Sequence, residues 1–234
     1  MDWKMKKFKL ILIKNISFWL VLMAIGCQQK TAEQKPAEAL PYYQDATFMP
    51  HWLSADDGAL NDFHCISSFT FINQEGKKVT EKTFEGKIYV ADFFFTSCPG
   101  ICPKMTKNMG LLQDEFLDDD EVLLLSHSVT PERDSVPVLK AYADEHAVVS
   151  EKWHLVTGTQ QGIYKLGRKD YFVEEDLGLE KDEDEFLHTE NFVLIDKNRH
   201  IRGIYNGLNK TSIHQLIADI KTLKNEAHNS PELK

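Results

Sequence analysis

The chain has 234 residues, of which 42% are hydrophobic and 27% charged, as in a globular protein large enough for one buried domain with extensions. Its net charge is -9, and without residues 1–26, which hold five lysines and one aspartate, the balance is -13. Because phosphate binding needs clustered lysine and arginine, this acidity argues against a nucleic-acid partner. It fits a cationic partner or a metal ion, although acidity also serves solubility alone.

The N-terminus has the pattern of a targeting segment. Lysines precede an apolar run over residues 16–26 that is too short to span a bilayer and typical of a signal peptide. The run ends with Gly26 directly before Cys27, which resembles a bacterial lipoprotein signal. The sequence therefore predicts a signal peptide over residues 1–26 and lipidation at Cys27. This places the chain in the bacterial cell envelope with its domain facing the periplasm, as the alternative of an uncleaved anchor also does.

The part that follows divides by composition. Residues 27–40 are polar without periodicity and predict a flexible tether, whereas aromatic residues in 41–62 predict an extension packed on the domain. Residues 63–225 are expected to form the main domain, and 226–234 a tail. Residues 174–185 read as a solvated acidic loop, with a role in docking left open.

Strand and helix patterns alternate through the main domain, then a hairpin and a final helix follow. This order predicts an α/β fold with a mixed β-sheet flanked by helices, and it matches a thioredoxin-like fold. The predicted strands are a hairpin turning at Gly76, then 87–95, 121–128, 153–158, 191–196 and 200–205. The predicted helices are 99–116, 136–146, 160–167 and 212–225.

The segment T-S-C-P-G-I-C-P-K-M, residues 96–105, contains two cysteines four positions apart. Pro99 suits the first turn of a helix, and a helix beginning there places Cys98 and Cys102 on one face, with Cα atoms roughly 6 Å apart. A helix N-terminus also lowers thiol pKa values. The pair suits either two thiolates for a metal or a reducible disulfide, and this geometry does not decide between them.

His188 is the candidate for a third ligand. A pair of soft thiolates selects copper(I) or zinc and needs at least one further ligand. His188 lies just before a predicted strand, and in a thioredoxin-like sheet the loop entering that strand faces the cysteine helix. An imidazole there could complete a Cys-Cys-His site.

Three ordered segments resemble the Sco (SenC-type) family over residues 63–222. They are T-S-C-P-G-I-C-P-K-M, L-S-H-S-V-T-P-E-R-D-S-V-P and F-L-H-T-E-N-F-V-L-I-D. The resemblance implies a thioredoxin-like domain on one membrane anchor that binds copper, most readily copper(I), through Cys98, Cys102 and His188. It also implies a metallochaperone that helps assemble the binuclear copper centre of cytochrome c oxidase, with the copper-bearing subunit or another copper protein as partner. Thr130 replaces an aspartate usual in the family, and a lipoprotein anchor replaces a transmembrane helix.

A membrane-anchored thiol-disulfide oxidoreductase, reducing copper-ligand cysteines of a partner, is the alternative. Two observations weaken it: the spacing is C-x-x-x-C, and no proline between Pro137 and Pro231 could supply the cis-proline of thioredoxin-type enzymes. A peroxide-consuming thiol enzyme is a third possibility, but no arginine is positioned by the sequence to activate peroxide.

Several other residues invite a simpler interpretation. Cys65 is expected to be a buried structural cysteine, and Met105 and Met109 to lie in the core. His127 is expected to lie beside the metal ligands or merely to be packed. Arg133 and Asp134 are expected to fix a turn by mutual pairing or by helix capping.

Overall fold

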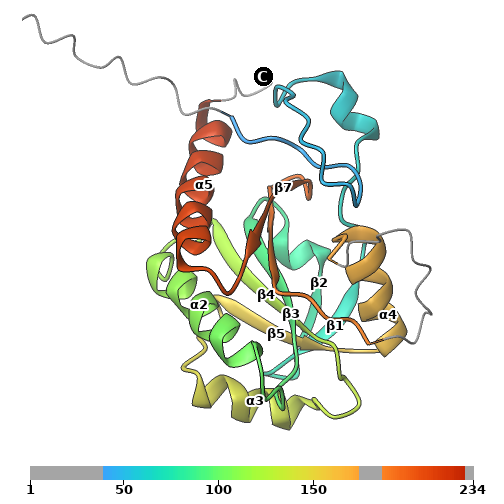
Figure 1. Cartoon of the computed structure of the whole chain (residues 1–234), viewed down its shortest axis with the longest axis vertical. Coiled ribbons are helices and arrows are strands. Elements are labelled where there is room, and N and C mark those ends of the chain that lie inside the picture. Colours follow the sequence, from blue (N-terminus) through green and yellow to red (C-terminus); the bar gives the residue numbers. More distant parts are fainter. Residues whose placement is uncertain (1–38, 174–185, 230–234) are drawn as a thin grey trace, which may run out of the picture. The chain divides into compact units, whose positions relative to one another are not determined.

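The computed structural model describes residues 39–173 and 186–229 (Figure 1). The predicted signal peptide, Cys27, most of the tether and the acidic loop 174–185 lie outside these residues. The described residues belong to one compact unit that begins at residue 39. In the described part of the chain, no helix combines the length and the apolar character needed to cross a bilayer.

Seven strands form one sheet in the order β2-β1-β5-β4-β3-β6-β7. In the centre of the sheet, β3 pairs in parallel with β4 and β4 in parallel with β5, whereas β3 and β6 are antiparallel. An antiparallel hairpin lies at each edge, β1–β2 at one and β6–β7 at the other. The sheet is therefore mixed, as the sequence predicted. The strands are β1 (Thr70–Asn73), β2 (Lys78–Thr80), β3 (Ile88–Phe94), β4 (Val122–Ser128), β5 (Trp153–Thr157), β6 (Asn191–Ile195) and β7 (Ile201–Asn206).

Helices cover both faces of this sheet (Figure 1). α2 (Cys102–Glu115), α3 (Val136–Glu145) and α5 (Lys210–Asn229) pack on one face. α4 (Gln160–Lys165) continues into the π-helical turn η3 (Leu166–Asp170), and these pack on the other face. The 3-10 helices η1 (Gly58–Asp62) and η2 (Glu81–Phe84) lie in the connections. This arrangement confirms the predicted α/β class.

The central strands explain the two separate cores. Every residue of β3 and of β4 is buried, because helices lie on both sides and leave no solvent-facing positions. Successive side chains of a strand point to opposite faces, so Val90 joins the core under α2 and α5 while Ala91 joins the core under α4. Because β3 and β4 are parallel, their carboxyl ends lie at the same end of the sheet, and the cysteine loop begins there.

The segment before η1 packs against the C-terminal half of the domain. Tyr42 is buried, and Tyr43 forms an isolated antiparallel bridge with Ile201 on β7. The Arg202 guanidinium lies 3.8 Å from the Tyr42 ring centroid, which is a cation–π contact. Trp52, by contrast, is 64% exposed.

Helix boundaries differ from the sequence predictions in three places. The predicted helix 99–116 begins only at Cys102, because the turn over residues 96–101 precedes it. The predicted helix 160–167 extends through η3 to Asp170. The final helix covers residues 210–229 rather than 212–225, since Asn209 accepts a hydrogen bond from the Thr211 N–H at its start.

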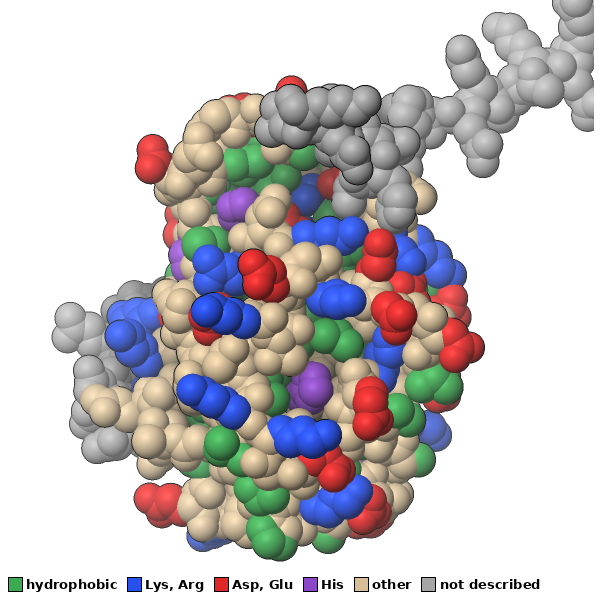
Figure 2. All heavy atoms as spheres, turned by 180° about the vertical axis from the view of Figure 1, so that it is seen from behind, with side chains coloured by type: hydrophobic (Ala, Val, Ile, Leu, Met, Phe, Trp, Pro, Cys, Tyr) green, Lys and Arg blue, Asp and Glu red, His purple; other side chains and the backbone are tan. Residues whose placement is uncertain are grey.

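Surface charge is dispersed on the side opposite to the view of Figure 1. Figure 2 shows basic and acidic side chains interspersed over that face. The negative net charge is therefore not gathered into one patch there.

Candidate metal centre

Cys98 and Cys102 lie on either side of the junction between a loop and a helix. Cys98 follows the end of β3, and its N–H donates to the Phe95 carbonyl at 3.3 Å. Cys102 is the first residue of α2, and Pro103 occupies the first turn, where its missing N–H leaves no bond unmade. The prediction that the helix begins at Pro99 was therefore wrong, and the two cysteines do not share one helical face.

The two thiols are free and hydrogen-bonded to each other. Burial acts to raise the pKa of Cys98, but hydrogen bonds from the backbone and thiol of Cys102 and from loop N–H groups bring it below its ordinary value. Burial raises the pKa of Cys102 to about 12, and the charge of Cys98 acts in the same direction. Cys98 is thus the more acidic thiol of the pair, and it loses its proton before Cys102 does.

Asp92 is a buried carboxyl on β3 near this pair. Burial raises its pKa to about 7, although a hydrogen bond from the Ser126 hydroxyl lowers it in part. Its Oδ1 atom has no hydrogen-bond partner within the described residues. A negative charge on Asp92 raises the pKa of Cys102. The sequence interpretation missed this residue, although an aspartate inside a continuous apolar strand was a visible signal.

Asp134 ties the cysteine loop to the end of β4. Its carboxylate is fully buried and accepts hydrogen bonds from the Thr96 N–H and hydroxyl at 3.2 and 2.6 Å. It also accepts from the hydroxyls of Ser128 at 2.5 Å and Thr130 at 3.1 Å. The prediction of pairing with Arg133 or of helix capping was wrong, because the acceptor capacity of Asp134 is directed inward. Thr130, the departure from the family pattern, is one of its donors.

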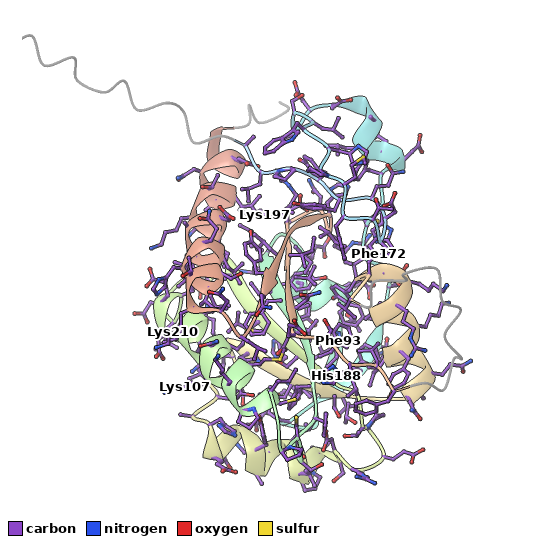
Figure 3. All side chains as sticks on the ribbon, viewed as in Figure 1. Phe93, Lys107, Phe172, His188, Lys197 and Lys210 are labelled. Carbon is purple, nitrogen blue, oxygen red and sulfur yellow. The ribbon has the colours of Figure 1, made fainter. Side chains whose placement is uncertain are left out.

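His188 lies on the segment that leads into β6. The neighbouring Leu187 is buried in the core under α4, whereas His188 itself is exposed. On the same segment, Phe186 contacts Phe95 edge to face, with ring centroids 5.4 Å apart. Phe95 lies three residues before Cys98. Figure 3 shows His188 toward the same end of the sheet as Phe93 of β3. The segment that carries His188 therefore crosses the strand end that carries the cysteine pair.

The three predicted ligands are not assembled as a metal site in this structure. Across residues 39–173 and 186–229, no three His, Cys, Asp or Glu side chains are grouped so that they could hold a metal ion. The structure brings the two thiols together and places the His188 segment against the same loop. The donor set fits a soft cation, because thiolates and an imidazole suit copper(I).

The remaining candidates lie apart from the thiol pair. Met105 and Met109 are fully buried in the core, as predicted. Cys65 is only half-buried, so the prediction of a buried cysteine was wrong. His127 is packed: its ring stacks on Phe93 with centroids 4.7 Å apart, on the sheet face opposite to Cys102.

Comparison with known proteins agrees with this geometry. The family model described as SCO1/SenC matches residues 58–225. The SCO1 protein homolog of Bacillus subtilis is 33% identical over 161 residues, which are 67% of this chain and 81% of that protein. The human mitochondrial SCO1 homolog is 32% identical over 132 residues, covering 54% of this chain and 42% of that protein.

Solved structures give the same result. A SCO1/SenC family lipoprotein from Bacillus anthracis superposes with a TM-score of 0.61 at 33% identity, covering 69% of this chain and 95% of that one. BsSco is described with a disulfide switch and as a member of the Sco family of cytochrome c oxidase assembly proteins. It superposes with a TM-score of 0.59 at 32% identity, covering 69% of this chain and 94% of that one. Arabidopsis thaliana ScoI, solved with copper bound, superposes with a TM-score of 0.52 at 26% identity, covering 66% of this chain and 97% of that one.

A mixed sheet with a cysteine pair between its central strand and the following helix defines a thioredoxin-like protein. The match of the family model over more than half of the sequence is specific beyond that class. This chain belongs to the SCO1/SenC family.

Proposed function

We propose that the chain binds copper(I) through Cys98, Cys102 and His188 and delivers it during assembly of the binuclear copper centre of cytochrome c oxidase. The observation that carries this proposal is the pair of free, mutually hydrogen-bonded thiols at the end of β3. A family relative solved with copper bound and another described as an oxidase assembly protein support it. Copper is here a cargo, so its release to a partner is part of the function.

The thiol pKa values suit the binding of a soft cation. The Cys98 thiolate forms most readily, because hydrogen bonds have already lowered its pKa. Cys102 must lose its proton when the metal binds, since thiolates rather than thiols ligate copper. The His188 imidazole can then approach from its exposed position on the segment before β6. Two sulfurs and one nitrogen form a set that copper(I) prefers to harder cations.

Membrane attachment is the second part of the proposal. We place the domain on a lipid anchor at Cys27, in the bacterial cell envelope and facing the periplasm. The small residue before Cys27 and the short apolar run support this, as does the description of the Bacillus anthracis relative as a lipoprotein. Metabolic labelling with a fatty acid tests it: wild type should incorporate the label and Cys27→Ala should not.

The decisive experiment measures copper retained by the reduced full chain. Protein in detergent is reduced without oxygen, given excess copper(I), desalted and analysed for bound copper. About one ion for each chain is expected, because Cys98, Cys102 and His188 together supply one set of three ligands. His188→Ala should weaken retention strongly, whereas His214→Ala, an exposed histidine on α5, should not. Equal retention by wild type and His188→Ala would overturn the ligand assignment.

A redox function is the second candidate, because the lowered pKa of Cys98 also suits a nucleophile. Its thiolate would attack a partner disulfide, forming a mixed disulfide and releasing one partner thiolate. Cys102 would then lose its proton and displace the second partner sulfur, which closes a Cys98–Cys102 disulfide and transfers two electrons. Rapid reduction of a model disulfide, together with no retained copper, would favour this function over copper delivery.

A further inference from the structure

The two most exposed large apolar side chains in the described part of the chain lie close together in the sequence. Met49 is 66% exposed and Trp52 is 64% exposed, whereas the next such residue, Leu117, is 46% exposed. Both belong to the stretch 44–57, which connects Tyr43 to η1. Neither residue has a role in the thiol site. Exposing two such side chains on one loop leaves apolar area in water that a contact could bury.

The loop presents these side chains on a defined backbone. Tyr42 and His51 form an antiparallel bridge, with N–H···O distances of 2.8 and 2.9 Å in the two directions. Asp45 accepts hydrogen bonds from the Thr47 N–H and hydroxyl at 2.9 and 2.5 Å. Phe48 has a φ of 50°, a conformation that is uncommon for a bulky residue and persists where surrounding contacts hold it.

Arg202 fixes the base of the loop to the domain. Its guanidinium is almost fully buried and donates to the carbonyls of Leu40 and Pro41 at 2.5 and 3.1 Å. The same group donates to Glu226 on α5 at 2.9 Å. The described chain therefore leaves toward its N-terminus from a fixed point beside the end of α5.

This exit point lies far from the thiol pair along the molecule. α5 starts beside the first turns of α2, because Asn108 of α2 donates to the Gly207 carbonyl at 2.6 Å. Glu226 is sixteen residues after Lys210, so the helix separates the two ends by about 24 Å. In Figure 1 the N-terminal extension lies at one end of the domain and α3 at the other.

We infer that the loop bearing Met49 and Trp52 is a membrane-contact element, and that its occupant is the lipid bilayer. This rests on the anchoring proposed above. Residues 28–38 can extend over at most about 40 Å between Cys27 and residue 39, which keeps the loop within reach of the surface. Tryptophan and methionine suit the interface, since each brings apolar area and tryptophan adds an N–H for the headgroups. Contact there leaves the thiol end of the domain directed away from the bilayer.

The charges around the loop indicate which lipids it favours. Hydrogen bonds lower the pKa values of Asp45 and Asp56, so both are charged at neutral pH, and Asp57 adjoins them in sequence. These carboxylates disfavour an anionic surface. Insertion of apolar side chains between zwitterionic headgroups, rather than attraction to anionic lipid, therefore carries the contact, and added salt should not weaken it.

The test reconstitutes the full chain in phosphatidylethanolamine–phosphatidylcholine vesicles and follows tryptophan emission. The difference between wild type and Trp52→Phe isolates residue 52 from the other tryptophans. We expect Trp52 emission to shift to shorter wavelength and to be quenched by lipids brominated on the acyl chains. The matched control is Val138→Trp in the Trp52→Phe background, an exposed position on α3, and it should stay quenchable only by aqueous acrylamide.

Three outcomes would overturn the inference. If acrylamide quenches the emission of Trp52 as strongly as that of the tryptophan placed at position 138, the loop does not contact the bilayer. A blue shift without lipid that grows with protein concentration means that a second copy covers the loop. Failure of the full chain to float with vesicles removes the anchor and the inference with it. None of these readouts involves copper, so they are separate from any failure of the metal-binding proposal.

Discussion

The Thr96 hydroxyl donates to the buried Asp134 carboxylate at 2.6 Å, which connects the cysteine loop to the segment that follows β4. Thr96 is the second residue after the end of β3, and Cys98 follows two positions later. The position of the Cys98 backbone therefore depends on a carboxylate 36 residues further along the chain. This dependence can be tested without altering either thiol.

Asp134→Asn should lower the free energy of unfolding by about 2–3 kcal/mol, the order expected for losing hydrogen bonds to a buried charge. The asparagine NH2 group would face hydroxyl and N–H donors whose hydrogen bonds the carboxylate now accepts, so some of these bonds would be lost. Urea denaturation of the reduced protein measures the loss. Glu132→Gln, an exposed neighbour, is the control and should change stability little. Unchanged stability in Asp134→Asn would show that the carboxylate does not hold the loop.

Alkylation should distinguish the two thiols of the reduced protein. Cys98 has a lowered pKa and is half-buried, whereas Cys102 is buried and its pKa is raised to about 12. Because only thiolates react appreciably, Cys98 should be modified well before Cys102 at neutral pH. Pulsed labelling with iodoacetamide, followed by peptide mass spectrometry, measures both rates. Equal rates at the two sites would contradict the assigned asymmetry.

Asp92 should make the reduced protein less stable as the pH rises. Its folded pKa of about 7 exceeds the ordinary value of 3.8, so between these values the folded state holds a proton that the unfolded state has lost. The contribution of Asp92 to stability therefore falls from about pH 4 to about pH 7 and is then constant. Asp92→Asn should remove this slope and be more stable than wild type at pH 8. Denaturation midpoints at pH 5 and 8 test it, and a lower midpoint for the variant at pH 8 would count against it.

His127 should produce the opposite slope. Burial lowers its pKa from 6.5 to about 4, so the unfolded state binds the extra proton first as the pH falls. Its contribution is complete above about pH 6.5 and is lost progressively toward pH 4. His127→Phe keeps the aromatic packing against Phe93 and should reduce acid sensitivity. Thermal melting between pH 4 and 7 measures this, and an unchanged pH profile would show that another group controls it.

Arg202→Lys should loosen the N-terminal extension. A lysine cannot reproduce the hydrogen bonds that different nitrogens of the guanidinium donate to Leu40, Pro41 and Glu226. It also cannot stack on the Tyr42 ring as the guanidinium does. We expect faster hydrogen exchange at Tyr42 and Tyr43, whose N–H groups bond to His51 and Ile201. Lys221→Arg, an exposed lysine on α5, is the control. Exchange that stays at the wild-type rate would place the restraint elsewhere.

Most of the fold could be predicted from local patterns, whereas the fine structure of the site could not. The buried runs of β3 and β4 follow from continuous apolar residues, and the turn at Gly76 from a residue that tolerates its φ of 71°. The start of α2 was mispredicted because Pro99 and Pro103 both suit a first helical turn, and only the packing of the loop selects between them.

Contacts between distant residues account for the other misses. No local pattern pairs Thr96 with Asp134, or indicates that Asp134 rather than Arg133 is the residue that matters. The position of His188 depends on how the segment before β6 crosses Phe95, which sequence alone does not determine. The role of Cys98, Cys102 and His188 as ligands therefore stays a prediction that a measurement of copper binding would test.

The buried position of Arg202 also determines where the folded unit can be cut. Residues 40–43 satisfy a guanidinium that is 4% exposed and cover part of β7, although the family match begins only at residue 58. A recombinant fragment trimmed to that match would lose the Leu40 and Pro41 carbonyls that accept from Arg202 and the Tyr42 ring that packs on it, and would leave the guanidinium with Asp196 and Glu226 alone. Fragments for crystallisation or spectroscopy should therefore start no later than residue 39.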